Sequence, residues 1–187
     1  ASESMVESVF QKLLPGCTTN RNNYYPINGS LKRLCENDSI VQYDDVLFIV
    51  EVKASSFAYT PPLTDFESHI KSYCKLIEEP NSQCVRTKDY LSSRKIAKFY
   101  NEDKSDKFLI DMSSITDIVM FSISVDNINT FASHAEKLSF IKTKCGAICI
   151  AIDDLMVYQD YFDSPLKFIH FLKQRMKASL LPALVTT

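Results

Sequence analysis

The chain has 187 residues, of which 45% are hydrophobic and 24% are charged, and its formal net charge at pH 7 is −2. That length and composition fit one soluble globular domain, and no apolar run is long enough to predict a membrane helix. The slightly acidic balance argues against a protein that coats nucleic acid with its whole surface, although a local basic patch stays compatible with it. We expect a single domain over 1–178 and an uncharged tail over 179–187 that links to a missing part of a longer protein.

The elements expected from the periodicity of apolar residues and from turn-forming residues alternate between helices and strands. In chain order they are a helix over 4–14, a loop over 15–30 with a short strand near 24–27, a hairpin over 31–53, a linker over 54–62, a helix capped by Thr64 and ended by Pro80, a helix over 82–97, a loop over 101–107, strands over 108–112 and 118–125, a helix over 131–140, a strand over 147–152, and helices over 153–162 and 164–176. This order predicts an α/β fold in which helices flank a central mixed β-sheet.

The hairpin holds the most informative pattern. Residues 46–52 are almost wholly apolar, which is typical of a strand covered on both faces, yet the strand ends in Glu51 and Lys53. These two side chains share a face because strand side chains alternate. If Asp44 and Asp45 form a two-residue turn, paired positions sum to 89 and Asp38 lies opposite Glu51. A loop of three or five residues would instead move Asp38 to the other face.

Two carboxylates on one face at that spacing repel each other, so one of them is pushed towards protonation. A divalent cation between them removes the repulsion. Oxygen ligands of this kind suit Mg²⁺ or Mn²⁺, which makes Asp38 and Glu51 candidate metal ligands. The other interpretation is a structural strand end whose charges are paired in a salt bridge.

An acid, a gap and then Glu-x-Lys at the end of an apolar strand resembles the PD-(D/E)xK, restriction-endonuclease-like nucleases. Asn37 stands where that family often has Pro. The segments 36–38 and 48–54 look most like its nuclease-related (NERD-like) branch. The resemblance implies a restriction-endonuclease-like core, and it covers the hairpin more specifically than the rest of the chain.

The resemblance also implies roles for individual residues. Asp38 and Glu51 would bind Mg²⁺ with the Val52 backbone carbonyl, and Lys53 would position or deprotonate the attacking water. Glu7 on the first helix matches a family Glu that faces the metal, and Gln83 matches a Gln on the helix after the hairpin. The alternatives are that Glu7 and Gln83 are ordinary solvated helix residues. Other polar residues stay open as well: Glu36 as support for the site, Asp44 and Asp45 as turn residues, and Arg21, Lys32, Arg33, Arg86, Lys88 and Arg94 as phosphate contacts or solvated charges.

Other kinds of site find little support. His69, His134 and His170 lack metal-ligand spacing, and only three glycines are present, so no glycine-rich phosphate loop is expected. The six cysteines are expected to be free thiols of a cytoplasmic protein, because several lie in apolar segments. They are Cys17, Cys35, Cys74, Cys84, Cys145 and Cys149.

The sequence therefore predicts a Mg²⁺- or Mn²⁺-dependent nuclease domain that hydrolyses phosphodiester bonds of nucleic acid, and DNA is the substrate we expect. The alternative is a catalytically inactive relative that keeps the fold to bind nucleic acid or protein. Hydrolysis of RNA or of a free nucleotide, a homodimer and further domains of a longer parent chain all stay open. No membrane association is expected.

Overall fold

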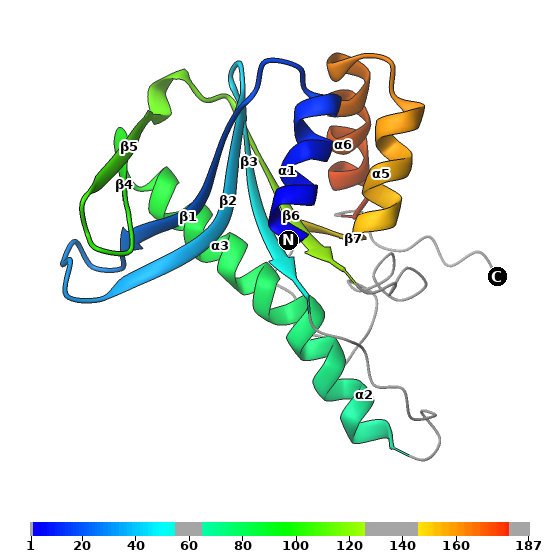
Figure 1. Cartoon of the computed structure of the whole chain (residues 1–187), viewed down its shortest axis with the longest axis horizontal. Coiled ribbons are helices and arrows are strands. Elements are labelled where there is room, and N and C mark those ends of the chain that lie inside the picture. Colours follow the sequence, from blue (N-terminus) through cyan, green and yellow to red (C-terminus); the bar gives the residue numbers. More distant parts are fainter. Residues whose placement is uncertain (1, 55–64, 126–145, 180–187) are drawn as a thin grey trace.

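The computed structural model describes residues 2–54, 65–125 and 146–179 (Figure 1). Its helices are α1 (Ser2–Leu13), α2 (Phe66–Tyr73), the π-helical η1 (Cys74–Glu78), α3 (Glu79–Ser92), the short 3₁₀ helix η2 (Met112–Ser114), α5 (Ile152–Tyr161) and α6 (Pro165–Ser179). Its strands are β1 (Thr18–Pro26), β2 (Leu34–Tyr43), β3 (Val46–Lys53), β4 (Ile96–Tyr100), β5 (Asp106–Asp111), β6 (Asp117–Ser124) and β7 (Ala147–Ala151).

The strands form one mixed sheet in the order β5-β4-β1-β2-β3-β6-β7. The five strands from β5 to β3 are antiparallel neighbours, whereas β3 pairs with β6, and β6 with β7, in parallel. Parallel pairing needs a crossover, and the segment containing α2, η1 and α3 lies between β3 and β4 in the chain. The predicted α/β fold with a central mixed sheet and flanking helices is therefore confirmed.

Two hydrophobic cores cover the two faces of the sheet. On one face α1, α5 and α6 pack against Val46, Phe48, Val50 and Val52 of β3. On the other face α3 packs against Leu47 and Ile49 of the same strand. Figure 1 shows α3 running along one side of the sheet, and α1, α5 and α6 on the opposite side. Strand β3 is thus sandwiched, which explains its apolar sequence.

The predicted hairpin is confirmed together with its register. Tyr43 pairs with Val46, and each following pair sums to 89 as far as Ser39 with Val50. Asp44 takes a positive φ of 50°, which a two-residue turn of this kind needs and which Asp tolerates better than most residues. Asp45 accepts a hydrogen bond from the backbone N–H of Thr116 at 2.8 Å through its own carbonyl, which ties the turn to the start of β6.

The segment 15–30 was wrongly predicted as mostly loop. Its polar stretch belongs to the nine-residue strand β1, which pairs with β2 along most of its length. Backbone pairing to a neighbouring strand outweighs the low strand propensity of Asn and Arg here, because tertiary context overrides propensity. The strand β4 was also missed, since α3 ends at Ser92 and, after a short turn, Ile96–Tyr100 are extended.

The helix boundaries near Pro80 differ from the expected ones as well. Pro80 lies at the start of α3, where its missing N–H is tolerated, so it begins a helical segment directly after η1. The cap of α2 is Asp65, whose carboxylate accepts a hydrogen bond from the backbone N–H of Ser68 at 3.1 Å, and Thr64 is outside the described residues.

Other expected elements agree with the structure to within about two residues: α1, β5, β6, β7, α5 and the start of α6. Several predictions lie outside the described residues, namely the linker beyond residue 54, the helix over 131–140, the tail beyond 179, Cys145 and His134. The described cysteines are all free thiols. In the described ranges, no helix combines the length and apolar character needed to cross a membrane.

Candidate active site

The candidate site lies where β2 and β3 separate. Regular pairing ends at Ser39 and Val50, and two side chains of β2 then take the place of backbone partners. The Asp38 carboxylate Oδ2 accepts a hydrogen bond from the backbone N–H of Val52 at 2.7 Å. The Asn37 amide Nδ2 donates to the carbonyl of Val50 at 3.2 Å. The strands therefore part without leaving these buried backbone groups unpaired.

The other neighbour of β2 is irregular at the same point. Strand β1 pairs Arg21 with Ser39 and Asn23 with Asn37, and no pair links Asn22 to Asp38. Asn22 adopts a positive φ of 52°, a left-handed conformation that Asn reaches more easily than most residues. Asp38 is thus released from regular pairing with both neighbouring strands, so its carboxylate can point along the sheet towards β3. Local disruptions of this kind are frequent beside active sites.

Glu51 is the most unusual residue of the sheet because it is a carboxylate with 0% exposure. Its Oε1 accepts a hydrogen bond from Asn37 Nδ2 at 2.9 Å, while no described residue donates a hydrogen bond to its Oε2. Burial raises the pKa of Glu51 well above its ordinary value, and the negative charge of Asp38 raises it further. The hydrogen bond from Asn37 and the charge of Lys53 act in the opposite direction. An unpartnered buried carboxylate oxygen beside a second carboxylate is a costly arrangement in a protein.

A buried amide pair holds the Glu51 carboxylate. Asn23 and Asn37 are both fully buried, and Asn23 Nδ2 donates to Asn37 Oδ1 at 3.2 Å and to the carbonyl of Asn20 at 2.8 Å. Asn23 therefore orients the Asn37 amide so that its N–H₂ group faces Glu51. The sequence analysis missed this role for both residues. One signal was available, since Asn37 is a polar residue directly before Asp38 where the resembling family often has Pro.

Lys53 shares the Glu51 face of β3 and is only partly exposed. That face is covered by α3, whose Cys84 lies near enough that the Glu51 charge adds to burial in raising the pKa of the thiol. Gln83, the residue before Cys84, is half-buried, and its buried side-chain Oε1 has no hydrogen-bond partner among the residues that the structure describes. The structure thus places Gln83 on the helix that covers the site, although no contact joins it to Asp38 or Glu51 within the described residues.

Glu7 lies elsewhere. Helix α1 packs on the face that carries Val50 and Val52, opposite the face of Glu51. The Glu7 Oε1 accepts a hydrogen bond from the Thr19 hydroxyl, and the Glu7 Oε2 forms an ion pair with Arg21 Nε at 3.1 Å. No contact joins it to Asp38 or Glu51 in the described part of the chain. Both oxygens of the Glu7 carboxylate thus contact side chains of β1. The described residues therefore give no support to the expected role of Glu7 as a metal ligand.

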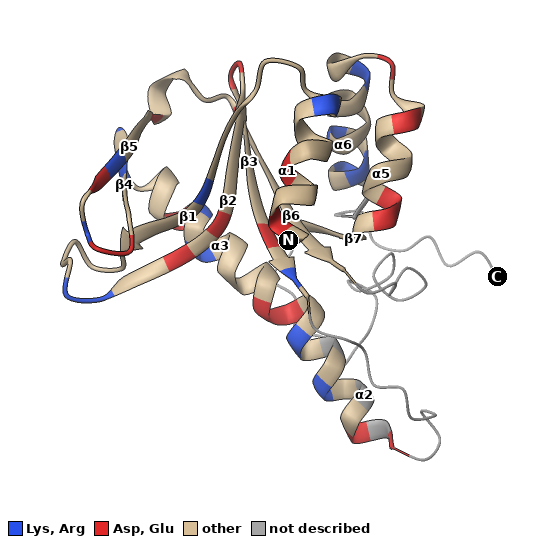
Figure 2. Ribbon diagram, in the orientation of Figure 1, with Lys and Arg blue, Asp and Glu red and all other residues tan. Residues whose placement is uncertain are grey.

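The remaining candidates have local partners. Glu36 accepts a hydrogen bond from the Tyr24 hydroxyl at 3.0 Å, and this contact together with burial raises the pKa of Tyr24 to about 12. Asp44 and Asp45 form the turn. Figure 2 shows acidic and basic segments interspersed over the molecule. Of the arginines that the sequence proposed for phosphate contact, Arg21 is neutralised by Glu7, whereas Arg86 and Arg94 lie together on α3 and just beyond it.

The oxygen donors at the site fit a small divalent cation. Asp38, Glu51 and the Val52 carbonyl are hard donors, and the unpartnered Glu51 Oε2 is an acceptor that a cation would satisfy. Both the N–H and the C=O of a strand residue point to the same side, so the Val52 carbonyl faces β2, as its N–H does. The described residues contain no group of three or more His, Cys, Asp or Glu side chains arranged to hold a metal. Protein binding of Mg²⁺ by only one or two carboxylates is, however, common.

Comparison with known proteins supports the fold. No protein-family model matches the chain, and no curated protein matches it either. Among solved structures, the chain is similar to the small subunit of the heterodimeric restriction endonuclease R.BspD6I, with 13% sequence identity and a TM-score of 0.50. The match covers 95% of this chain and 80% of that subunit.

The chain has a restriction-endonuclease-like fold. At this level of identity the likeness establishes the fold alone, and it agrees at that level with the superfamily expected from the hairpin. It does not distinguish the nuclease-related branch, which stays a prediction.

Proposed function

We propose that this protein is a divalent-metal-dependent nuclease domain that hydrolyses phosphodiester bonds, with DNA as the preferred substrate. The observation that carries the proposal is the fully buried Glu51 carboxylate beside Asp38, at the point where two strands separate, whose Oε2 receives no hydrogen bond from any described residue. Glu51 forms no salt bridge with any described residue, as the interpretation of a paired strand end would require. Lys53, the third residue of the proposed site after Asp38 and Glu51, lies on the same face of β3 as Glu51.

The protein residues have separate tasks in this proposal. Asp38 and Glu51, with the Val52 carbonyl, would hold Mg²⁺ or Mn²⁺, which supplies a more acidic bound water and positive charge for the phosphate. Asn37 fixes Oε1 of Glu51, which leaves Oε2 directed away from the amide. Lys53 accepts a proton from the attacking water or stabilises the negative charge that develops on the phosphate. Gln83 would orient substrate from α3.

The solved neighbour is one subunit of a heterodimeric restriction endonuclease. By analogy, the present chain is proposed to act on DNA and to need a partner. That partner is either a second copy of the chain or a further domain of a longer protein. The second candidate function is a catalytically inactive module. The observation that favours it is the small number of carboxylates gathered at the site among the described residues.

The test compares cleavage of linear and circular DNA by wild type and by Glu51→Gln, with Mg²⁺, Mn²⁺ or EDTA. Metal-dependent cutting that the Gln variant loses supports the nuclease. Calorimetry with Mn²⁺ separates the alternatives when the wild type does not cut alone. Mn²⁺ binding that depends on Asp38 and Glu51 indicates a nuclease that needs a partner, and absence of such binding indicates the inactive module.

A further inference from the structure

A cavity of about 300 Å³ lies between α3 and the end of β1, outside the carboxylate site. Its wall includes the side chains of Arg86 and Arg94, and Tyr25 and Tyr90 line it from the strand and the helix. Ser82 and Ser93 add hydroxyl groups. The cavity is therefore rich in hydrogen-bond donors.

Both guanidinium groups are held in place by protein atoms. Arg86 Nε donates to the Tyr25 hydroxyl at 3.2 Å, and that hydroxyl shares a 3.0 Å hydrogen bond with Thr87 Oγ1. Tyr25 itself is only 1% exposed, so it is a rigid anchor. The guanidinium carbon of Arg94 lies 3.9 Å from the centre of the Tyr90 ring, and its Nη1 donates to the Tyr90 carbonyl at 2.7 Å.

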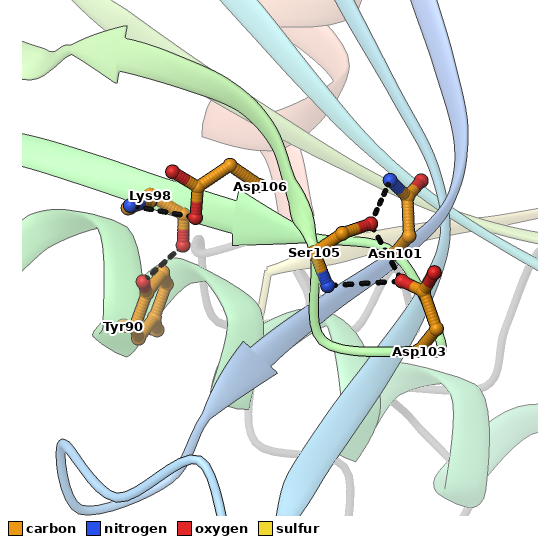
Figure 3. A network of polar contacts seen from close by, with 6 residues as sticks. All are labelled: Tyr90, Lys98, Asn101, Asp103, Ser105 and Asp106. Atoms are coloured by element: carbon orange, nitrogen blue, oxygen red, sulfur yellow. Dashed lines mark hydrogen bonds and ion pairs between the residues drawn. The ribbon is translucent and has the colours of Figure 1, made fainter.

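The partner that holds Arg94 is itself fixed to the sheet. The Tyr90 hydroxyl donates to the carbonyl of Lys98 on β4 at 2.5 Å, as Figure 3 shows. In the same view the Lys98 ammonium group pairs with Asp106 of β5 at 2.7 Å, next to the network of hydrogen bonds that shapes the β4–β5 turn. Tyr90, which holds Arg94, is thus hydrogen-bonded to β4, and β4 is in turn joined to β5 by the Lys98–Asp106 ion pair.

Within the described residues, no ion pair neutralises the two arginines of the cavity. Neither Arg86 nor Arg94 forms an ion pair with any described residue, and the Nη atoms of Arg86 have no hydrogen-bond partner among those residues. Asp89 also lines the cavity, but it pairs with neither arginine. A net positive pocket of this kind contrasts with the overall charge of −2. Planar guanidinium groups with free N–H donors match the oxygens of a phosphate.

We propose that this cavity binds a phosphate group of a nucleic-acid strand and so positions the strand for the carboxylate site. The inference rests on the proposed function for the identity of the strand. Helix α3 links the two places, because Gln83 lies one turn before Arg86 and the helix covers the face of Glu51 and Lys53. The phosphate is either internal to the strand or at its end, and the chemistry is the same for both.

The test is equilibrium binding of fluorescent oligonucleotides, single- and double-stranded, in EDTA so that no cleavage takes place. Arg86→Gln and Arg94→Gln are compared with Lys88→Gln, which removes the same charge from an exposed residue of α3 that does not line the cavity. We expect each arginine variant to bind about tenfold more weakly and to lower the salt slope by about 0.7 to 0.9. Lys88→Gln should change the affinity less than twofold.

Equal losses for the three variants, or no binding of any oligonucleotide by the wild type, would overturn the proposal. Thermal melting checks folding, and Arg94→Gln tests the cavity on its own when Arg86→Gln does not fold. Strands with and without a 5′- or 3′-phosphate then separate the two sources: a loss confined to end-phosphorylated strands identifies a terminal phosphate, and an equal loss on all strands identifies an internal one. Arginine-dependent binding without metal-dependent cutting and without Mn²⁺ binding at Asp38 and Glu51 would leave this inference standing and refute only the nuclease activity.

Discussion

Replacing Glu51 by Gln should stabilise the metal-free protein at neutral and alkaline pH. Glu51 is fully buried, its Oε2 has no hydrogen-bond partner in the described part of the chain, and the charge of Asp38 lies close by. Gln has the same shape, keeps an oxygen for the Asn37 amide, and presents an N–H₂ group towards the Asp38 carboxylate. An unsatisfied buried polar group costs about 1–3 kcal/mol, and a charged one more, so we expect a gain of at least about 1 kcal/mol at pH 8.

The pH dependence of stability follows from the direction of the Glu51 pKa shift. In the unfolded chain Glu51 loses its proton near the ordinary value of 4.5, whereas the folded protein holds the proton to a higher pH. Above pH 4.5 the folded state therefore binds more protons than the unfolded state, so this group lowers the stability as pH rises until the folded pKa is passed. The Gln variant lacks this loss, and the difference between variant and wild type should grow with pH and then level off.

The assay is thermal unfolding in EDTA over pH 5 to 9, followed by the same scan with Mn²⁺. For a chain of this size 1 kcal/mol corresponds to about 2–4 °C in Tm. Mn²⁺ at a hundred times its Kd should stabilise the wild type by about 2.7 kcal/mol and the Gln variant by much less. A Gln variant that is less stable than wild type at pH 8, or an equal effect of Mn²⁺ on both proteins, would refute the reasoning.

Three further outcomes are expected. Lys53→Ala should abolish DNA cleavage while Mn²⁺ still raises Tm, because Lys53 acts on water and phosphate rather than on the metal; loss of the Tm shift would contradict this. Asn37→Ala should lower the free energy of unfolding by about 1–3 kcal/mol in urea titrations, since Val50 and Glu51 both lose a buried donor. Phe48→Ala should cost about 3–5 kcal/mol by the same measurement, because its buried ring packs 5.7 Å from that of Phe10, and a smaller loss would indicate that the core collapses into the space.

The register of the hairpin was predictable because two local features agree. The turn at Asp44 fixes the pairing sum, and the apolar run of β3 fixes which strand is buried, so the register from Tyr43–Val46 to Ser39–Val50 followed by counting, whereas the separation of the strands beyond that pair did not. The start of α6 was equally accessible, since Pro165 after Ser164 is a strong start signal. Where adjacent residues determine the geometry, the sequence is sufficient.

Features that depend on distant parts of the chain were not predictable in this way. Strand β1 is polar along its first half and is held by pairing with β2, which no local pattern reveals. The hydrogen bond between Asn23 and Asn37 joins residues 14 positions apart, so a single sequence shows two unremarkable amides. The separation of Glu7 from the site likewise depends on which face of the sheet α1 covers.

The separation of β2 from β3 and the carboxylate site are one structural feature. A continuous ladder would extend past Ser39 and Val50 to pair the backbone of Asn37 with that of Val52, and neither Asp38 nor Asn37 would need a side chain to complete it. Instead their side chains bind Val52 N–H and the Val50 carbonyl, so the strands part while the groups between them stay satisfied. A Pro at position 37 has no side-chain donor, so it would hold neither the Val50 carbonyl nor the Glu51 carboxylate. Asn37 therefore opens the sheet and orients the Glu51 carboxylate with a single amide, which gives a physical reason for the departure from Pro at this position.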